Sequence, residues 1–125
     1  MVINRKLFAF IVIALTALSL NAQDLKWARK PIRIGTYNIQ YPAKKPAWTD
    51  RLPAIVRLLE DNDFDVFGAQ EPFLPQIEDI MKYIGKEYSW VGGCTTGDNT
   101  SRKAHFNPIF YKKKRLELLD HGVIW

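Results

Sequence analysis

The stretch FDVFGAQEP, residues 64–72, starts as a β-strand and ends on a carboxylate. Its first seven residues are mainly β-favourable, which is typical of a short buried strand. Glu71 and Pro72 then close the segment. Charged side chains are rarely buried unless they are paired or bind a metal. Glu71 therefore either caps the segment that follows or supplies an oxygen ligand at the end of the strand.

A strand and a helix precede this segment in the sequence. Residues 31–38, PIRIGTYN, predict a strand because apolar and polar side chains alternate at its start. Residues 49–61 have apolar side chains at helical spacing, and Thr49 is the expected N-cap of that helix. We therefore expect 31–38 and 64–70 to be parallel neighbours, joined by a right-handed crossover through the helix.

The rest of the chain predicts one more helix and three more strands. The expected elements are a helix at 73–85, a strand at 88–93, a polar loop at 94–105, and a β-hairpin formed by 106–111 and 116–125. This order of strands and helices is typical of an α/β protein.

The N-terminus has the pattern of a secretory signal peptide, residues 1–22. A basic start is followed by an apolar run at 7–20, which is shorter than the ~20 residues that span a bilayer. We predict cleavage after Ala22 and a linker at 23–30; an uncleaved anchor is the alternative. The chain is therefore expected to be exported, to the periplasm or outside the cell, without stable membrane association after cleavage.

The composition excludes one class of exported protein. The chain of 125 residues has one cysteine, Cys94, so no disulfide can form within it. A disulfide-stabilised scaffold is excluded, and the core must supply the stability. The formal net charge of +5 is mildly basic and permits, without requiring, a polyanionic partner.

Asn38 and Glu71 are the candidate site residues. If their strands are parallel neighbours, both residues lie at the carboxyl edge of the sheet, where open α/β sheets bind ligands. A carboxylate with an amide oxygen suits Mg²⁺, and also Mn²⁺ or Ca²⁺, better than zinc. The alternatives are structural: Glu71 as a cap of the 73–85 helix, and Asn38 as the start of an Asx turn.

Three motifs in this order resemble the endonuclease/exonuclease/phosphatase superfamily: IRIGTYNIQY (32–41), DFDVFGAQEP (63–72) and FNPIFYKKKRLELLDHGVIW (106–125). The resemblance implies that 31–125 is the N-terminal half of a four-layer α/β/β/α sandwich, a deoxyribonuclease-like domain truncated at its C-terminus. It also implies that Asn38 lines the active site and that Glu71 is a ligand of the catalytic divalent metal.

The resemblance implies a chemistry as well: attack of an activated water on a phosphodiester or phosphomonoester. We therefore predict a secreted, divalent-metal-dependent phosphoesterase, present here as an incomplete chain. The substrate is a nucleic acid, a phospholipid head group or a phosphorylated metabolite, and the oligomeric state is left open. The rival hypothesis is a non-catalytic exported fragment or binding module that keeps the sheet without the chemistry.

The chain departs from the family at two places. His105 stands where similar members usually carry a glutamate that helps to orient a catalytic histidine. Here it either binds phosphate when protonated or caps the strand. The family's other catalytic motifs lie downstream of Trp125, and Asp120 and His121 are expected to belong to the hairpin rather than to the catalytic set.

Three further features have structural and functional interpretations. The run KKKR, 112–115, is expected to be a solvated hairpin tip, with phosphate contact as the alternative. Asp98 and Asn99 lie in the polar loop, where they are either near a substrate or ordinary turn residues. Packing in the core is expected of the dispersed tryptophans Trp27, Trp48 and Trp90.

Overall fold

The computed structural model describes residues 30–123, most of which belong to a compact unit that begins at Ile32. The predicted signal peptide, 1–22, lies outside the described residues, as does all but the last residue of the predicted linker. Within 30–123, neither helix combines the length and the apolar character that a membrane span needs.

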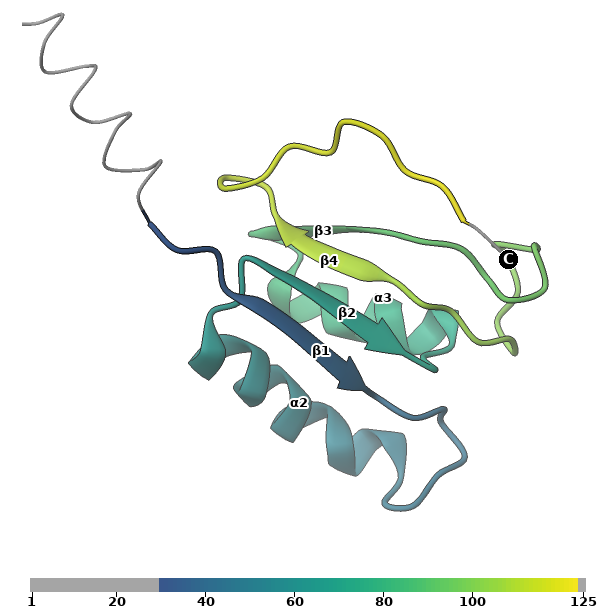
Figure 1. The fold of residues 1–125 in the computed structure, drawn as a ribbon. Helices are drawn as coiled ribbons and strands as arrows, with labels where there is room; N and C mark the ends of the chain where they lie inside the picture. The colour runs from purple at the N-terminus through teal and green to yellow at the C-terminus, as the bar shows by residue number, and fades with distance from the viewer. Residues whose placement is uncertain (1–29, 124–125) are drawn as a thin grey trace, which may run out of the picture. The chain divides into compact units, whose positions relative to one another are not determined.

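The described residues form a four-stranded mixed sheet with two helices (Figure 1). In chain order the elements are β1 (Ile34–Asn38), α2 (Trp48–Asn62), β2 (Val66–Gln70), α3 (Leu74–Ile84), β3 (Tyr88–Val91) and β4 (Ile109–Lys112). The strand order is β1-β2-β4-β3; β1 and β2 are parallel, as predicted, and β4 is antiparallel to both of its neighbours. The α/β prediction is confirmed.

Both helices pack on one face of the sheet and share a single core with it (Figure 1). Alternate residues of β2 and β4 point into this core, and the rings of Phe67 and Phe110 stack at 4.6 Å. The helices contribute Ile55, Leu59, Ile77, Ile80 and Ile84. This packing fixes the ends of β1 and β2 relative to α3.

The other face of the sheet is open and apolar. Ile34 is 76% exposed and Ile109 is 49% exposed, although both are strand residues. Residues 116–123 run back alongside this face and line a groove of about 540 Å³ together with β2, β3 and β4 (Figure 1). An open apolar sheet face is what half of a two-sheet sandwich leaves uncovered.

The predicted hairpin of 106–111 and 116–125 is wrong. The strand β4 pairs with β2 on one side and with β3 on the other, so neither of its edges is left for a hairpin partner. Residues 116–123 accordingly form no strand in the part of the chain that the structure describes.

The predicted cap of the first helix is also wrong. The N-cap of α2 is Ala47, and it makes no side-chain capping bond. The helix starts at Trp48, one residue earlier than expected, so Thr49 lies inside its first turn. Instead, the Arg51 Nε donates to the carbonyl oxygen of Pro46 at 2.9 Å, just before the helix begins. The segment before α2 is therefore held from within the helix.

Candidate functional site

Asn38 and Glu71 meet at the carboxyl edge of the sheet. Asn38 is the last residue of β1, and Glu71 follows β2 directly. The parallel register sets Asn38 opposite Gln70, which brings both side chains to one edge. The Nδ2 of Asn38 donates a hydrogen bond to Glu71 Oε1 at 2.8 Å. The structure thus brings together the two residues that the sequence singled out.

The amide of Asn38 is oriented by the turn that follows it. Its Oδ1 accepts the N–H of Gln40 at 2.9 Å, which is the Asx turn named as the structural alternative. Because the oxygen serves the turn, the amide nitrogen points to Glu71. In this arrangement Asn38 orients the carboxylate; its role as a second metal ligand stays a prediction.

The backbone is strained at Glu71 itself and two residues after Asn38. Gln40 has a φ of 62° and Glu71 a φ of 67°, both in the left-handed region. Residues other than glycine adopt this region infrequently, at a cost of order 1–3 kcal/mol, and such residues cluster at functional sites. The surrounding structure must therefore hold both strand ends in place.

Glu71 does not cap the helix that follows it. The N-cap of α3 is Phe73, whose N–H donates to Gln76 Oε1 at 3.0 Å. Glu71 is half-buried, and its contact with Asn38 engages only Oε1. Within residues 30–123, nothing engages the second carboxylate oxygen, Oε2. The bond to Oε1 holds the carboxylate in place, and Oε2 can still bind a cation.

These residues fit a hard divalent cation in one respect. Mg²⁺ often takes only one or two protein carboxylates and completes its shell with water and substrate phosphate oxygens. Glu71 supplies one oriented carboxylate with an open oxygen. In the described part of the chain, no three side chains of His, Cys, Asp or Glu gather into a fuller site. Residues 30–123 thus offer one ligand of such a centre rather than all of it.

His105 contacts two aromatic rings beside the site. Its ring lies 5.7 Å from that of Tyr41 and 5.2 Å from that of Phe73. Tyr41 comes three residues after Asn38, and Phe73 comes two residues after Glu71. The N–H of Phe106 also donates to the Pro72 carbonyl at 2.8 Å, which holds this part of the chain against the site. The ring of His105 therefore packs; its phosphate-binding role stays a prediction.

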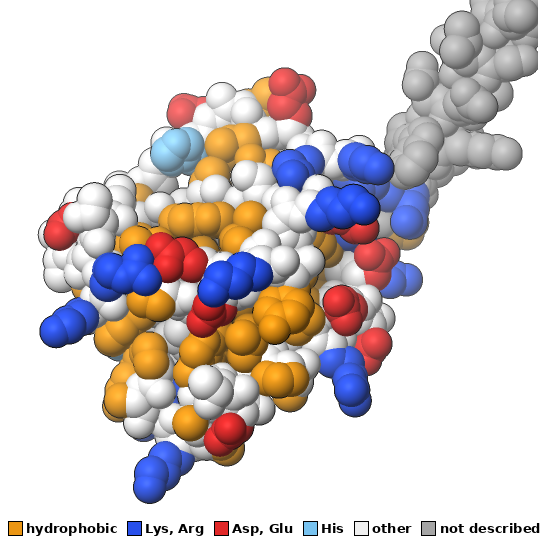
Figure 2. All heavy atoms as spheres, turned by 180° about the vertical axis from the view of Figure 1, so that it is seen from behind, with side chains coloured by type: hydrophobic (Ala, Val, Ile, Leu, Met, Phe, Trp, Pro, Cys, Tyr) orange, Lys and Arg blue, Asp and Glu red, His pale blue; other side chains and the backbone are white. Residues whose placement is uncertain are grey.

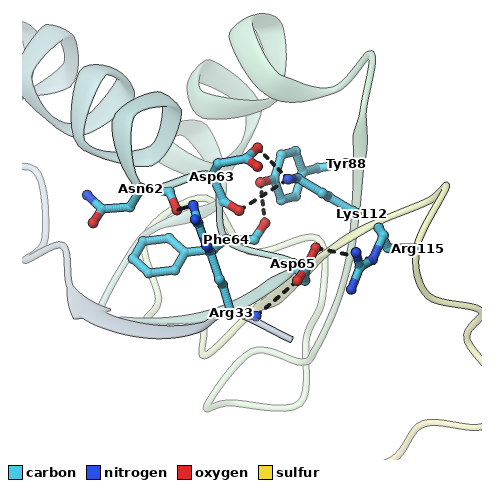
Figure 3. Close-up of polar contacts among 8 residues, drawn as sticks. All are labelled: Arg33, Asn62, Asp63, Phe64, Asp65, Tyr88, Lys112 and Arg115. Atoms are coloured by element: carbon cyan, nitrogen blue, oxygen red, sulfur yellow. Dashed lines mark hydrogen bonds and ion pairs between the residues drawn. The ribbon is translucent and has the colours of Figure 1, made fainter. Parts of the chain in front are cut away.

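A second polar cluster lies at the amino edge of the sheet, around the start of β2 (Figure 3). Asp65 is only 2% exposed; its Oδ2 accepts the N–H of Arg33 at 2.9 Å, and its Oδ1 lies 3.5 Å from Arg115 Nε. The Lys112 ammonium forms an ion pair with Asp63. Carboxylates and cations neutralise each other here, so this cluster stabilises the fold.

The interpretation of 112–115 as a solvated tip is therefore wrong for half of its residues. Lys112 is buried in β4, and Arg115 is largely buried against Asp65. Lys113 and Lys114 remain exposed. Two of the four cations serve internal ion pairs, so the run is not a continuous phosphate-contacting surface.

The loop residues Asp98 and Asn99 are used within their own loop. The Asp98 carboxylate accepts the Thr100 hydroxyl at 2.6 Å and the Thr100 N–H at 3.0 Å, and these bonds lower the pKa of Asp98. Asn99 Oδ1 accepts the N–H of Cys94 at 2.8 Å. Their turn role is established, and their approach to a substrate stays a prediction.

The remaining polar and aromatic candidates have local structural roles. The exposed Asp120 accepts the N–H of His121 at 2.8 Å, in a segment without strand structure. The indole of Trp48 donates to Asp79 at 2.9 Å. Trp48 and Trp90 both pack against the core, as expected; Trp27 lies outside the described residues.

Two residues that support the site, Arg51 and Gln76, were not predicted from the sequence. Gln76 occupies the third position of α3, and a glutamine at this position of a helix is a known capping signal. That signal was available in the sequence. Arg51, in the first turn of α2, has no comparable signature.

The charges on the face that carries the helices are mixed. Figure 2 shows acidic and basic side chains interspersed among hydrophobic ones, without a broad patch of one sign. A surface that binds a polyanion along its length would show a stripe of cations. This face does not have one.

No protein-family model matches the chain, and no curated protein matches it. Several solved structures do match part of it. A mannosyl-6-phosphatase from Bacteroides thetaiotaomicron VPI-5482 is 26% identical with a TM-score of 0.65, over 74% of this chain and 35% of its own. An endonuclease/exonuclease/phosphatase family protein from the same species is 26% identical with a TM-score of 0.64, over 73% and 34%.

A third neighbour is an endonuclease/exonuclease/phosphatase from Bacteroides vulgatus, 27% identical with a TM-score of 0.63, over 71% of this chain and 34% of its own. The chain thus spans about a third of the length of these neighbours. They confirm the predicted resemblance and the predicted fold, a part of the endonuclease/exonuclease/phosphatase fold.

Proposed function

We propose that this chain, which has part of the endonuclease/exonuclease/phosphatase fold, contributes the metal ligand Glu71 to a divalent-metal-dependent phosphoester hydrolase. The observation that carries the proposal is the Asn38–Glu71 hydrogen bond of 2.8 Å at the carboxyl edge of two parallel strands. Ligands bind at this edge in open α/β sheets. The carboxylate is fixed there through one oxygen, and the other oxygen is open.

The two side chains have separate roles in the proposed reaction. Glu71 would hold a Mg²⁺ or Mn²⁺ ion through its carboxylate. When bound, the ion would supply positive charge that polarises the substrate phosphate and stabilises the charge that develops on it. Asn38 donates to Oε1 and thereby fixes the direction of that carboxylate, as outer-shell partners of metal ligands commonly do.

We propose a small phosphorylated metabolite, such as a sugar phosphate, as the substrate. The likeness to a mannosyl-6-phosphatase, at 26% identity, supports this class. The mixed charges of the face in Figure 2 and the internal pairing of Lys112 and Arg115 do not favour a nucleic acid, which needs several free cations. Nucleic acids and phospholipid head groups are the competing classes.

We also propose that the protein is exported through residues 1–22. The apolar run and the basic start support this placement. Sequencing the N-terminus of the exported protein should find Gln23 first. Soluble cytoplasmic material that begins at Met1 would contradict it.

The test compares turnover in the full-length protein. Phosphate release from sugar phosphates, from DNA and from phospholipid head groups is measured against Mg²⁺ and Mn²⁺ concentration. Glu71→Gln keeps the shape and one oxygen but removes the charge that binds a hard cation, so metal-dependent turnover should fall by more than about 100-fold. Glu60→Gln, which removes an exposed acid on α2, is the matched control and should leave turnover unchanged.

Two outcomes would contradict the proposal. Wild-type turnover of Glu71→Gln at limiting metal would make Glu71 a structural residue. If no phosphoester is hydrolysed with either metal by the wild-type protein, the non-catalytic binding module becomes the better account.

A further inference from the structure

The loop that follows Asn38 is held by a single side chain from α2. The Arg51 guanidinium donates to the carbonyl oxygens of Ile39, of Tyr41 at 3.0 Å and of Pro46 at 2.9 Å. These carbonyls come from both ends of the 39–46 loop. A guanidinium offers five N–H donors in a rigid fork, so one arginine can fix a loop that has no regular structure of its own.

A second side chain joins this loop to the segment that follows Glu71. Gln76 is 1% exposed, and its amide is used at both ends. Its Nε2 donates to the carbonyl of Gln40 at 2.9 Å, and its Oε1 accepts the N–H of Phe73 at 3.0 Å. One buried amide thus connects the chain just after β1 with the chain just after β2.

These bonds close a ring around the site. Gln76 bonds to Gln40, the N–H of Gln40 bonds to Asn38, and Asn38 bonds to Glu71. Glu71 leads in two residues to Phe73, which bonds back to Gln76. The ring contains both left-handed residues, Gln40 and Glu71, whose conformations persist only if the surroundings hold them.

We propose that Gln76, supported by Arg51, is a positioning residue of the site: it locks the loop after β1 onto the start of α3 and so keeps Asn38 against Glu71. The proposal rests on the proposed function for the role of Glu71. Gln76 bonds directly to neither site residue: it reaches Asn38 through Gln40 and Glu71 through the chain at Phe73.

Two substitutions of Gln76 separate the lock from the helix cap. Gln76→Glu keeps the acceptor for the Phe73 N–H but has no amide donor for the Gln40 carbonyl. Gln76→Met keeps the length and loses both bonds. Arg51→Lys tests the same loop from α2 if a buried substitution at 76 prevents folding. Ile84→Val is the matched control, since it loosens the same helix at its other end, about 12 Å along the axis from Gln76.

The first measurement is amide hydrogen exchange in the whole protein. Because one hydrogen bond is worth about tenfold in an opening equilibrium, the Gln40 amide should exchange about tenfold faster in both Gln76 variants and in Arg51→Lys. The Phe73 amide should be faster in Gln76→Met and unchanged in Gln76→Glu. Unchanged exchange at Gln40 in folded variants would overturn the lock, whatever the activity.

The second measurement is the Mn²⁺ concentration that gives half-maximal turnover. We expect it to rise about 10–100-fold in Gln76→Glu, as for other residues that orient a metal ligand, and to stay unchanged in Ile84→Val. A wild-type Mn²⁺ dependence in Gln76→Glu, beside an impaired Glu71→Gln, would overturn the positioning role. If Glu71→Gln is itself fully active, the proposed function fails, and the exchange at Gln40 still decides the lock.

Discussion

The two ends of β2 each carry a carboxylate, and the protein uses them in opposite ways. Asp65, just before the strand, is 2% exposed and contacts the backbone of Arg33 and the guanidinium of Arg115. Glu71, just after the strand, is half-buried and contacts Asn38 through one oxygen. Similar chemistry on one strand therefore stabilises the fold at one end and leaves a binding group at the other.

The partners explain the difference. The amino edge supplies cations, Lys112 and Arg115, which neutralise the acids that they touch. The carboxyl edge supplies amides, from Asn38 and Gln76, which orient groups without cancelling charge. A carboxylate held by an amide keeps its negative charge for an incoming cation. The type of partner thus distinguishes the proposed metal ligand from the structural acid.

The largest effect on stability should come from the amino edge. Asp65→Asn keeps an acceptor for the Arg33 N–H but removes the negative charge beside the largely buried Arg115. Breaking one partner of a buried ion pair costs about 3–5 kcal/mol. Urea unfolding should show this loss in the free energy of unfolding.

Asp61→Asn is the control for that experiment, because Asp61 is an exposed acid on α2. Its free energy of unfolding should change by less than about 0.5 kcal/mol. If Asp65→Asn also changes the free energy of unfolding by less than about 0.5 kcal/mol, the ion pair at the amino edge does not stabilise the fold.

The next largest effect is expected at the carboxyl edge, where a substitution should lower activity. Asn38→Ala removes the donor to Glu71 and the Asx turn with Gln40. We expect metal-dependent turnover to fall about 10–100-fold, less than for Glu71→Gln, because Asn38 orients the ligand. Steady-state kinetics against Mn²⁺ will test it. A loss as deep as that of Glu71→Gln would instead favour Asn38 as a second ligand.

A smaller effect concerns Tyr88, at the amino edge. Its hydroxyl donates to the Phe64 carbonyl, and burial, with nearby Asp63, raises the pKa of Tyr88 to about 12 (Figure 3). A raised pKa means that this stabilisation is complete below pH 10 and is lost as the pH rises from 10 to 12. Tyr88→Phe should cost about 1 kcal/mol at neutral pH and should flatten this part of the pH profile.

Thermal melts of the wild type and of Tyr88→Phe from about pH 8 to about pH 12, on both sides of the ordinary tyrosine pKa of about 10, will compare the two profiles. Parallel profiles would show that Tyr88 does not couple the amino edge to pH.

The smallest effect should come from the surface. Arg102 forms two hydrogen bonds of 2.8 Å with Glu78, which lower the pKa of Glu78, but both side chains are exposed. Exposed ion pairs often contribute nothing measurable. Arg102→Ala should therefore leave both the melting temperature and the turnover unchanged. A clear drop in turnover would extend the site to the loop that carries Arg102.

The sequence predicted the parallel pair β1 and β2, and with it the meeting of Asn38 and Glu71, because alternation and crossover rules act over short distances. It did not predict that β4 lies between β2 and β3 in the sheet. The strands β2 and β4 pair across about 40 residues of sequence, and such distant pairing leaves no local pattern. For the same reason KKKR looked solvated: the acids that bury Lys112 and Arg115 lie some 50 residues earlier. Gln76 was detectable from its helix position alone, but its bond to Gln40 was not.

The most direct test of the comparison is the shift in melting temperature that Mn²⁺ causes in the whole protein and in two variants. Any ligand that binds only the folded state adds stability, about 2.7 kcal/mol at 100 times its dissociation constant. We predict that Mn²⁺ raises the melting temperature of the wild type and, by the same increment from a lower start, that of Asp65→Asn. Glu71→Gln should start near the wild-type melting temperature and lose the increment. An undiminished Mn²⁺ shift in Glu71→Gln would contradict the assignment of the metal ligand to the carboxyl end of β2.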